Sequence, residues 1–253
     1  MRRLRRLLER RAARDEEHAF VVEGPKLLAE AMRGGAEILD VFVPSGVEDG
    51  VVLRAAAGGA RHHVLAPGVL ERVADTVTPQ PVVAIVRRTD VDLDALHRAQ
   101  FLVVCVDVRD PGNLGTVLRV AEGSGAGGVI CCEGSVDAYS PKTVRASAGS
   151  LFHVPVVAGG EPLEVLDRMG RWGMQRMATD AHSGAPYDSV DLTAPTALLL
   201  GNEAHGLGDD LAPHFDGTVT IPMVGRTESL NVGMAAAVLC FERARQCRAR
   251  QGA

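Results

Sequence analysis

Polar residues follow directly on apolar segments at two places in the C-terminal third of the chain. Residues 198–207 read LLLGNEAHGL, and residues 221–238 read IPMVGRTESLNVGMAAAV. Each segment runs from a predicted strand into a polar turn, and the second then enters a predicted long helix. Because α/β proteins bind ligands where strands end in such turns, both turns are predicted to face a ligand.

The residue types in these turns suit close backbone approach and hydrogen bonding. Gly201 lets the backbone come near a flat ligand, and the carbonyls around Pro222 can accept a hydrogen bond from an adenine amino group. Glu203 either accepts hydrogen bonds from its own loop or orients a catalytic arginine. Ser229 and Asn231 either cap the last helix or face the ligand.

A third polar turn, DVRDPGNLG at residues 107–115, also leaves an apolar strand and enters a helix. Asn113 stands where a helix N-cap belongs, and it either caps the helix or contacts the same ligand. Arg119 lies six residues further on. It either pairs with Glu122 on the helix surface or reaches a phosphate or ribose from the same strand end.

Several other motifs are excluded. The glycine run at residues 123–128 follows a helix and precedes a strand, which is the wrong order for a phosphate-cradling turn. The chain has no Walker-type sequence, Ser-His-Asp order, paired carboxylates or His-rich metal spacing, so no metal site is predicted. His205 is interpreted as a solvated loop residue or, alternatively, as an acid or base.

Composition limits the class of protein. The 253 residues are 46% apolar, enough for one large or two small domains, and contain no long uninterrupted apolar run. The N-terminus lacks the apolar run of a signal peptide, and five scattered cysteines without a Cys-x-x-Cys favour a reducing cytoplasm. We therefore expect a cytoplasmic protein with no membrane partner.

Charge is unevenly distributed, although the net charge is −5. Residues 1–14 hold seven arginines and one acidic residue, Glu9, which makes this arm locally +6 and the remainder −11. A basic arm on an acidic body suits a protein that touches phosphate at one place. Alternatively, the arm is the solvated face of a helix, because Leu4, Leu7 and Leu8 fall at helical spacing.

The chain alternates between predicted strands and helices, which indicates a parallel sheet covered on both faces. The charged stretch at residues 87–98 is the predicted linker, with a domain boundary near residue 97. After the basic helix, strands are predicted at 20–24, 38–43, 64–65, 82–86, 101–106, 128–132, 154–157, 175–179, 196–200 and 218–221, and helices at 26–33, 51–57, 67–73, 113–124, 141–148, 162–172 and 230–248.

Taken together, the three segments resemble the signature of the SpoU (TrmH) family of RNA ribose 2′-O-methyltransferases. The matching stretches are DPGNLGTVLR at 110–119, LLGNEAHGL at 199–207 and IPMVGRTESLNV at 221–232. The resemblance implies a parallel α/β sheet (SPOUT-type) whose C-terminal segment forms a deep trefoil knot, over residues 98–253. Residues 1–97 resemble the family's small, ribosomal-protein-like α/β domain, which binds the RNA substrate.

The resemblance also implies S-adenosylmethionine as cofactor, RNA as partner and a homodimer formed through the knotted domain. It assigns the reaction site to Asn113, Arg119, Glu203, Ser229 and Asn231, and the cofactor site to Thr179, Leu200, Gly201, Ile221, Met223 and Leu230. Arg119 is the group expected to act on the ribose hydroxyl. Because an arginine is a poor base, we expect it to stabilise the developing alkoxide electrostatically.

The expected activity is 2′-O-methylation of a ribose in 23S ribosomal RNA. A transfer RNA substrate is the nearest alternative, and a non-catalytic RNA-binding or ribosome-assembly factor on the same scaffold is the alternative of another class. The chain departs from the family pattern at Gly233, where a small polar residue is common. This glycine is expected to loosen the start of the last helix.

Overall fold

The computed structural model describes residues 1–47, 49–70, 72 and 80–251, which form two compact units. The first unit contains Met1–Thr89 and Tyr139–His153, and the second contains Asp90–Ala138 and Val154–Ala253. The chain therefore passes between the units three times, whereas the boundary expected at residue 97 implied a single passage. The assignment of substrate binding to residues 1–97 and of methyl transfer to residues 98–253 stays a prediction.

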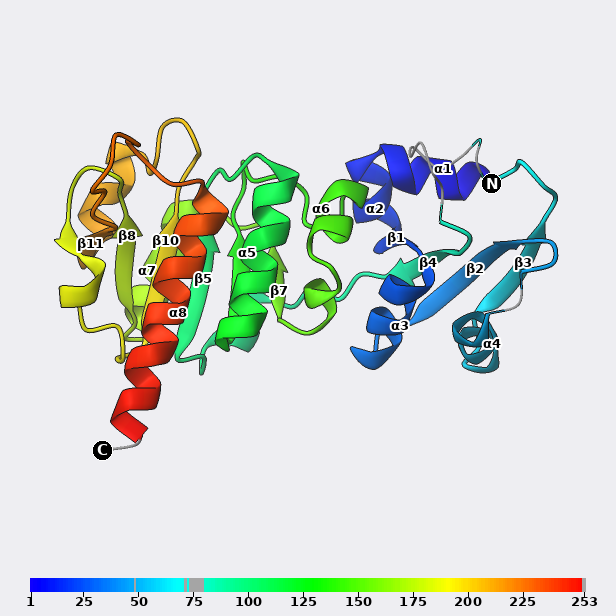
Figure 1. The fold of residues 1–253 in the computed structure, drawn as a ribbon, viewed down its shortest axis with the longest axis horizontal. Helices are drawn as coiled ribbons and strands as arrows, with labels where there is room; N and C mark the ends of the chain where they lie inside the picture. Colours follow the sequence, from blue (N-terminus) through cyan, green and yellow to red (C-terminus); the bar gives the residue numbers. More distant parts are fainter. Residues whose placement is uncertain (48, 71, 73–79, 252–253) are drawn as a thin grey trace. The chain divides into compact units, whose positions relative to one another are not determined.

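The first unit is built on a four-stranded sheet in the order β1-β4-β2-β3, in which β4 runs antiparallel to both neighbours and β3 runs parallel to β2 (Figure 1). Apolar side chains of the sheet and of the first helix, including Leu4, Leu7, Val21, Phe42 and Ile85, form its core. The elements are α1 (Arg2–Glu9), α2 (Arg11–Glu17), β1 (Ala19–Glu23), α3 (Pro25–Arg33), β2 (Ile38–Pro44), α4 (Gly50–Ala57), β3 (Arg61–Leu65) and β4 (Val83–Arg87).

The basic arm is a packed part of the first unit. It forms two helices that break at Arg10, whose backbone is extended. The inward side chains Leu4 and Leu7 are buried, and the buried guanidinium of Arg14 donates to the Leu7 carbonyl at 2.6 Å. The helical spacing of the leucines thus predicted helix for this segment correctly, apart from the break at Arg10.

A segment that follows β6 in the chain completes the first unit. It contains α6 (Pro141–Ala146) and a short 3-10 helix, η2 (Ser150–Phe152). The ring of Phe20 on β1 lies 4.8 Å from the ring of Tyr139 and 5.9 Å from that of Phe152. Arg145 of α6 also forms an ion pair with the buried Glu23. The core around β1 therefore needs a stretch of chain that lies more than a hundred residues away in sequence.

The second unit is a seven-stranded, fully parallel sheet in the order β7-β6-β5-β10-β8-β11-β9, which confirms the predicted α/β class. In Figure 1, α5 and α8 lie side by side in front of this sheet and α7 lies behind it. Its elements are η1 (Leu93–Leu96), β5 (Phe101–Cys105), α5 (Pro111–Ser124), β6 (Gly128–Cys131), β7 (Val156–Ala158), α7 (Pro162–Arg171), β8 (Gln175–Thr179), β9 (Ala185–Pro186), η3 (Tyr187–Ser189), β10 (Thr196–Leu200), η4 (Asp209–His214), β11 (Gly217–Thr220) and α8 (Val232–Gln251).

The predicted elements differ from the structure in a few places. The helix predicted at 67–73 is wrong for residues 67–70, which form a turn, and residues 71 and 73 lie outside the described part. The two-residue strand β9 was not predicted, because a pair containing proline shows no alternation. Over the described residues, no helix combines the length and the apolar character needed to cross a membrane.

Candidate active site

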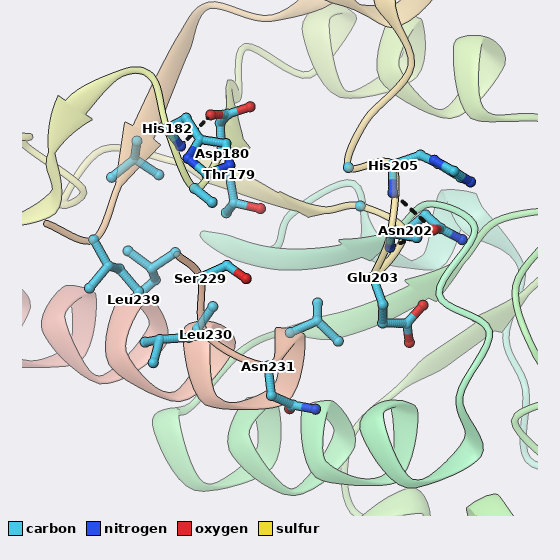
Figure 2. Close-up of a pocket in the computed structure, with 18 of the residues that line it drawn as sticks. Thr179, Asp180, His182, Asn202, Glu203, His205, Ser229, Leu230, Asn231 and Leu239 are labelled. Carbon is cyan, nitrogen blue, oxygen red and sulfur yellow. Dashed lines mark hydrogen bonds between the residues drawn. The ribbon is translucent and has the colours of Figure 1, made fainter. Parts of the chain in front are cut away.

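A cavity of about 430 Å³ opens at the carboxyl ends of β8, β10 and β11. Thr179 ends β8, Gly201 follows β10, and Ile221 follows β11, so three neighbouring strands deliver their turns to one place. The first turn of α8 closes the remaining side (Figure 2). Strand ends gathered in this way form the usual ligand site of a parallel α/β sheet.

The turn after β10 is a tight hairpin held by its own backbone. Asn202 and Gly206 exchange two N–H···O bonds of 2.9 Å each. A Cβ atom at Gly201 would lie 2.4 Å from the carbonyl carbon of Gly206, so only glycine fits between β10 and this hairpin. The Asn202 side chain accepts from the backbone N–H of Ala204 and His205 and donates to the carbonyl of Asp107 at 3.0 Å. These bonds fix the wall that carries Glu203.

Glu203 connects the β10 turn to the start of α5. Its Oε1 accepts from the side-chain amide of Asn113 at 2.8 Å and from the backbone N–H of Asp110 at 3.2 Å. Its Oε2 accepts from the backbone N–H of Arg109 at 3.3 Å. The predicted cap role of Asn113 is wrong, because Asp110 is the residue that caps α5: its carboxylate accepts the Asn113 N–H at 2.8 Å. The Asn113 side chain does not cap the helix and can therefore donate its amide N–H to Glu203.

Asn231 extends this network to α8. Its Oδ1 accepts from the backbone N–H of Gly233 at 2.9 Å and so caps the helix. Its Nδ2 donates to the Asn113 Oδ1 at 2.7 Å. Because a carboxylate only accepts and a backbone N–H only donates, the two amide orientations are determined by the network itself. The hydrogen-bond network Asn231–Asn113–Glu203 therefore joins the start of α8, the start of α5 and the turn after β10, and each of its bonds has a single donor-to-acceptor direction.

The network keeps Glu203 ionised. Partial burial on its own raises the pKa of a carboxyl group, but the hydrogen bonds from Asn113 and from the backbone of Arg109 and Asp110 outweigh it and lower the pKa of Glu203. An ionised carboxylate with its oxygens occupied by donors is a poor proton acceptor. Glu203 is thus suited to positioning Asn113 and the α5 start.

Most of the predicted residues line the cavity. Of the residues predicted to hold the cofactor, these are Thr179, Gly201, Ile221, Met223 and Leu230, and of those predicted for the reaction, Glu203, Ser229 and Asn231. Figure 2 shows the Ser229 side chain directed toward the side of the cavity where Glu203 lies. Leu200 is fully buried in the strand below and does not line the cavity.

Arg119 lies outside the cavity of its own chain. Its side chain is exposed on α5, six residues beyond Asn113, and it makes no hydrogen bond or ion pair with any residue that the structure describes. The alternative pairing with Glu122 is therefore not formed. Asn113 does not line the cavity either, although its side chain bonds to Glu203 and Asn231, which do.

Sequence reasoning did not assign a role to Asp180 and His182, which line the cavity opposite Glu203 (Figure 2). The Asp180 carboxylate accepts from the backbone N–H of His182 and of Ser183 at 2.7 Å each, which closes a tight turn directly after β8. An aspartate placed immediately after a buried strand was the available signal. His205 also lines the cavity and is exposed. No cluster of His, Cys, Asp or Glu side chains suited to a metal ion occurs within the described residues.

Comparison with known proteins identifies both halves of the chain. Residues 100–241 match the SpoU rRNA Methylase family, and residues 1–84 match an MRM3-like substrate binding domain. The chain is 31% identical to the 23S rRNA (guanosine(2553)-2′-O)-methyltransferase RlmP of Bacillus subtilis, over 92% of each chain. It is 38% identical to the 23S rRNA (uridine(2479)-2′-O)-methyltransferase of Streptomyces viridochromogenes, over 72% of this chain and 66% of the relative.

A solved structure agrees with these matches. The SpoU methyltransferase AviRb from Streptomyces viridochromogenes, in complex with AdoMet, superimposes with a TM-score of 0.87 at 32% identity, covering 97% of this chain and 96% of that one. The three motif segments recognised in the sequence all lie within the matched family region. The chain belongs to the SpoU rRNA methylase family.

Proposed function

We propose that the protein transfers a methyl group from S-adenosylmethionine to a ribose 2′-hydroxyl of 23S ribosomal RNA. The observation that carries the proposal is the cavity at the ends of β8, β10 and β11, where a glycine-dependent turn meets a polar network of asparagine and glutamate side chains. A relative that matches the chain over nearly its whole length is named for this reaction on this RNA. This support favours ribosomal RNA over transfer RNA.

The residues of the cavity fit S-adenosylmethionine. A volume of about 430 Å³ suits a ligand of nucleoside size, and the wall combines apolar side chains with exposed backbone. Gly201, Ile221, Met223 and Leu230 would hold the cofactor, with Thr179 at the far end. The Thr179 hydroxyl is already committed to the Leu199 carbonyl at 2.8 Å, so it shapes the site rather than donating to a ligand. When bound, the cofactor supplies an electrophilic sulfonium methyl group.

The protein must place the ribose and make its hydroxyl oxygen more nucleophilic. Ser229, Glu203 and Asn231 line the cavity on the side opposite Asp180 and His182, so the ribose is expected there. The Asn231–Asn113–Glu203 network would hold this wall in place during the reaction. None of these groups is a strong base at neutral pH, and charge stabilisation of the developing alkoxide is assigned to a cation.

Arg119 is the proposed cation, supplied by the second subunit of a homodimer. Its exposed position on α5 and its absence from the cavity of its own chain support this arrangement. The outward side of the neighbouring α8 exposes the large apolar residues Met234 and Phe241, which a second copy would cover. The knotted C-terminal segment and the cytoplasmic location expected from the sequence belong to the same proposal.

The activity is tested by incubating the protein with labelled S-adenosylmethionine and separate pools of 23S, 16S and transfer RNA. Label is expected in 23S RNA at a single ribose, identified by mapping the methylated nucleotide. Transfer only to another pool, or none to 23S RNA while the cofactor still binds, would refute the proposed substrate.

The supply of Arg119 by the second subunit is tested by co-expressing two inactive variants, Arg119→Ala and Asn113→Asp, with different affinity tags. If Arg119 acts across the dimer, one site of the mixed dimer has both residues intact and activity returns to about half of wild type. If Arg119 acts within its own chain, both sites stay defective and the mixed dimer is inactive. A protein that remains monomeric at assay concentration contradicts the arrangement directly.

A further inference from the structure

A cluster of hydrogen-bonded polar side chains lies in the first unit, whereas the cavity belongs to the second. Asp40 on β2 is only 4% exposed. Its Oδ1 accepts from Arg61 Nε and His63 Nε2, and its Oδ2 accepts from Arg61 Nη2 and Arg3 Nη1, all at 2.7–2.8 Å. Because a carboxylate only accepts, His63 must carry its proton on Nε2. One buried carboxylate thus fixes the orientation of three side chains from α1 and β3.

The ring of His63 lies flat on the ring of Phe42. The centroids are 4.6 Å apart and the planes differ by 12°. Phe42 is 6% exposed, whereas 40% of the His63 side chain and 67% of the Arg61 side chain remain exposed. Since Phe42 covers one face of the imidazole, only the opposite face is left for a second stacking partner. The cluster therefore presents an oriented aromatic plane beside an oriented guanidinium.

Positive charge is concentrated next to this plane. Residues 1–17 hold seven arginines against four acidic residues. Arg3, Arg6 and Arg11 form ion pairs with Asp40, Glu16, Glu17 or Asp15. Arg2, Arg5 and Arg10 are exposed and form no ion pair with any described residue. Arg2 and Arg5 lie on α1, the helix that contributes Arg3 to the cluster, and Arg10 lies at the break that follows it.

Stability alone does not account for this arrangement. Burial by itself raises the pKa of Asp40, while the bonds from Arg61 and His63 and the charges of Arg61 and Arg3 lower it overall, so the carboxylate is ionised and needs cationic partners. A single arginine in bidentate contact satisfies that need. The additional, half-exposed and stacked histidine costs side-chain entropy without filling the core, which is the pattern of a recognition surface.

We propose that His63 and Arg61 form a stacking platform for an unpaired nucleobase of the RNA substrate, with Arg2, Arg5 and Arg10 contacting the flanking phosphates. RNA-binding proteins recognise unpaired bases by stacking on aromatic and guanidinium planes, and they bind the backbone through arginines. The inference rests on the proposed function, because it identifies where the first unit holds the RNA. It commits to single-stranded or looped RNA as the partner.

The test compares full-length variants in RNA binding, by fluorescence anisotropy with fragments of 23S RNA, and in methylation kinetics. His63→Ala is expected to raise the RNA Kd and KM about tenfold, the effect of one lost stacked base, with kcat and cofactor affinity unchanged. His63→Phe keeps an aromatic plane and is expected to stay within about threefold of wild type. Arg61→Ala is expected to weaken binding and to reduce its salt dependence.

His62→Ala is the matched control. His62 is the adjacent exposed residue of the same strand, and its side chain points to the opposite face of the sheet. It is expected to leave RNA binding unchanged. Equal Kd values for His63→Ala and His62→Ala would overturn the platform, as would a His63→Phe variant as weak as His63→Ala. Failure of the proposed function is a different outcome: the wild-type protein would then methylate no 23S RNA, whatever the Kd values of the variants.

Discussion

Asp40 in the first unit and Glu203 in the second each organise a network, but they do so in opposite ways. Asp40 is buried and bonds to two arginines and a histidine. Glu203 is exposed and bonds only to uncharged donors, two backbone N–H groups and the Asn113 amide. The pKa of both carboxyl groups is lowered although burial opposes it. The first network neutralises its carboxylate with cations, and the second leaves a negative charge at the rim of the cavity.

The difference separates two tasks. A carboxylate surrounded by cations holds them in place for an anionic partner and contributes to the stability of the unit. A carboxylate held by neutral donors fixes geometry while remaining negative, so it cannot itself attract a phosphate or stabilise an alkoxide. Supplying a cation to the second site is the role proposed for Arg119.

The largest effect is expected for Asn113→Asp. The substitution keeps the shape but places a second carboxylate against Glu203, where an amide now donates at 2.8 Å. Repulsion should separate the α5 start from the β10 turn and lower kcat about 100-fold, as displacements of about 1 Å do in active sites. Glu122→Gln on the same helix is the control. If kcat of Asn113→Asp matched that of the control, the network would have no part in the reaction.

A smaller effect is expected for Asp40→Asn, and on a different quantity. The amide cannot accept from Arg3, Arg61 and His63 together, so the free energy of unfolding should fall by about 2 kcal/mol. The Tm should drop by roughly 4–8 °C, measured by calorimetry. With saturating RNA, kcat should stay close to wild type. A loss of kcat without a loss of stability would remove the contrast between the two carboxylates.

Glu203→Gln is expected to lower kcat about tenfold. The new amide NH2 group would face the backbone N–H of Arg109, from which the carboxylate oxygen now accepts a hydrogen bond. It also changes the pH dependence of stability. A carboxyl group with a lowered pKa in the folded state stabilises the protein above its ordinary pKa of 4.5 and loses this contribution as pH falls through the lowered value. The stability difference between wild type and Glu203→Gln should therefore be largest above pH 4.5 and shrink below it. A pH-independent difference would show that the charge of Glu203 is not involved.

The strand ends of the site could be predicted from sequence, but the bonds between them could not. Gly201, Glu203 and Ile221 follow apolar runs, and that local pattern indicates a turn at the edge of a sheet. The partners of Asn113 lie 90 and 118 residues away, and they meet because β5 pairs with β10 in the centre of the sheet. No local sequence pattern predicts the order of the strands in the sheet.

The segment 139–153 shows the same limit for the fold. A helix was predicted at residues 141–148 and is found at Pro141–Ala146, and the alternation of strands and helices assigned it to the second unit. Its buried aromatic residues pack instead on Phe20 of the first unit. Aromatic side chains indicate burial, but they do not indicate which core receives them.

Gly233 gives the smallest expected effect and corrects the expectation that it loosens α8. A Cβ atom here would lie 2.8 Å from Thr116 Cγ2 on α5, and the Gly233 N–H is bound to Asn231. Gly233→Ala should push the helices apart by a few tenths of an ångström and lengthen the Asn231–Asn113 bond, lowering kcat about threefold. Its stability should change little, because higher helix propensity offsets the overpacking.

Gly123→Ala is the control. Its new Cβ makes an ordinary 3.6 Å contact with Phe241, so the variant gains the same helix propensity and should leave kcat unchanged. Equal kcat values for the two variants would mean that the close approach of α5 and α8 does not orient Asn231.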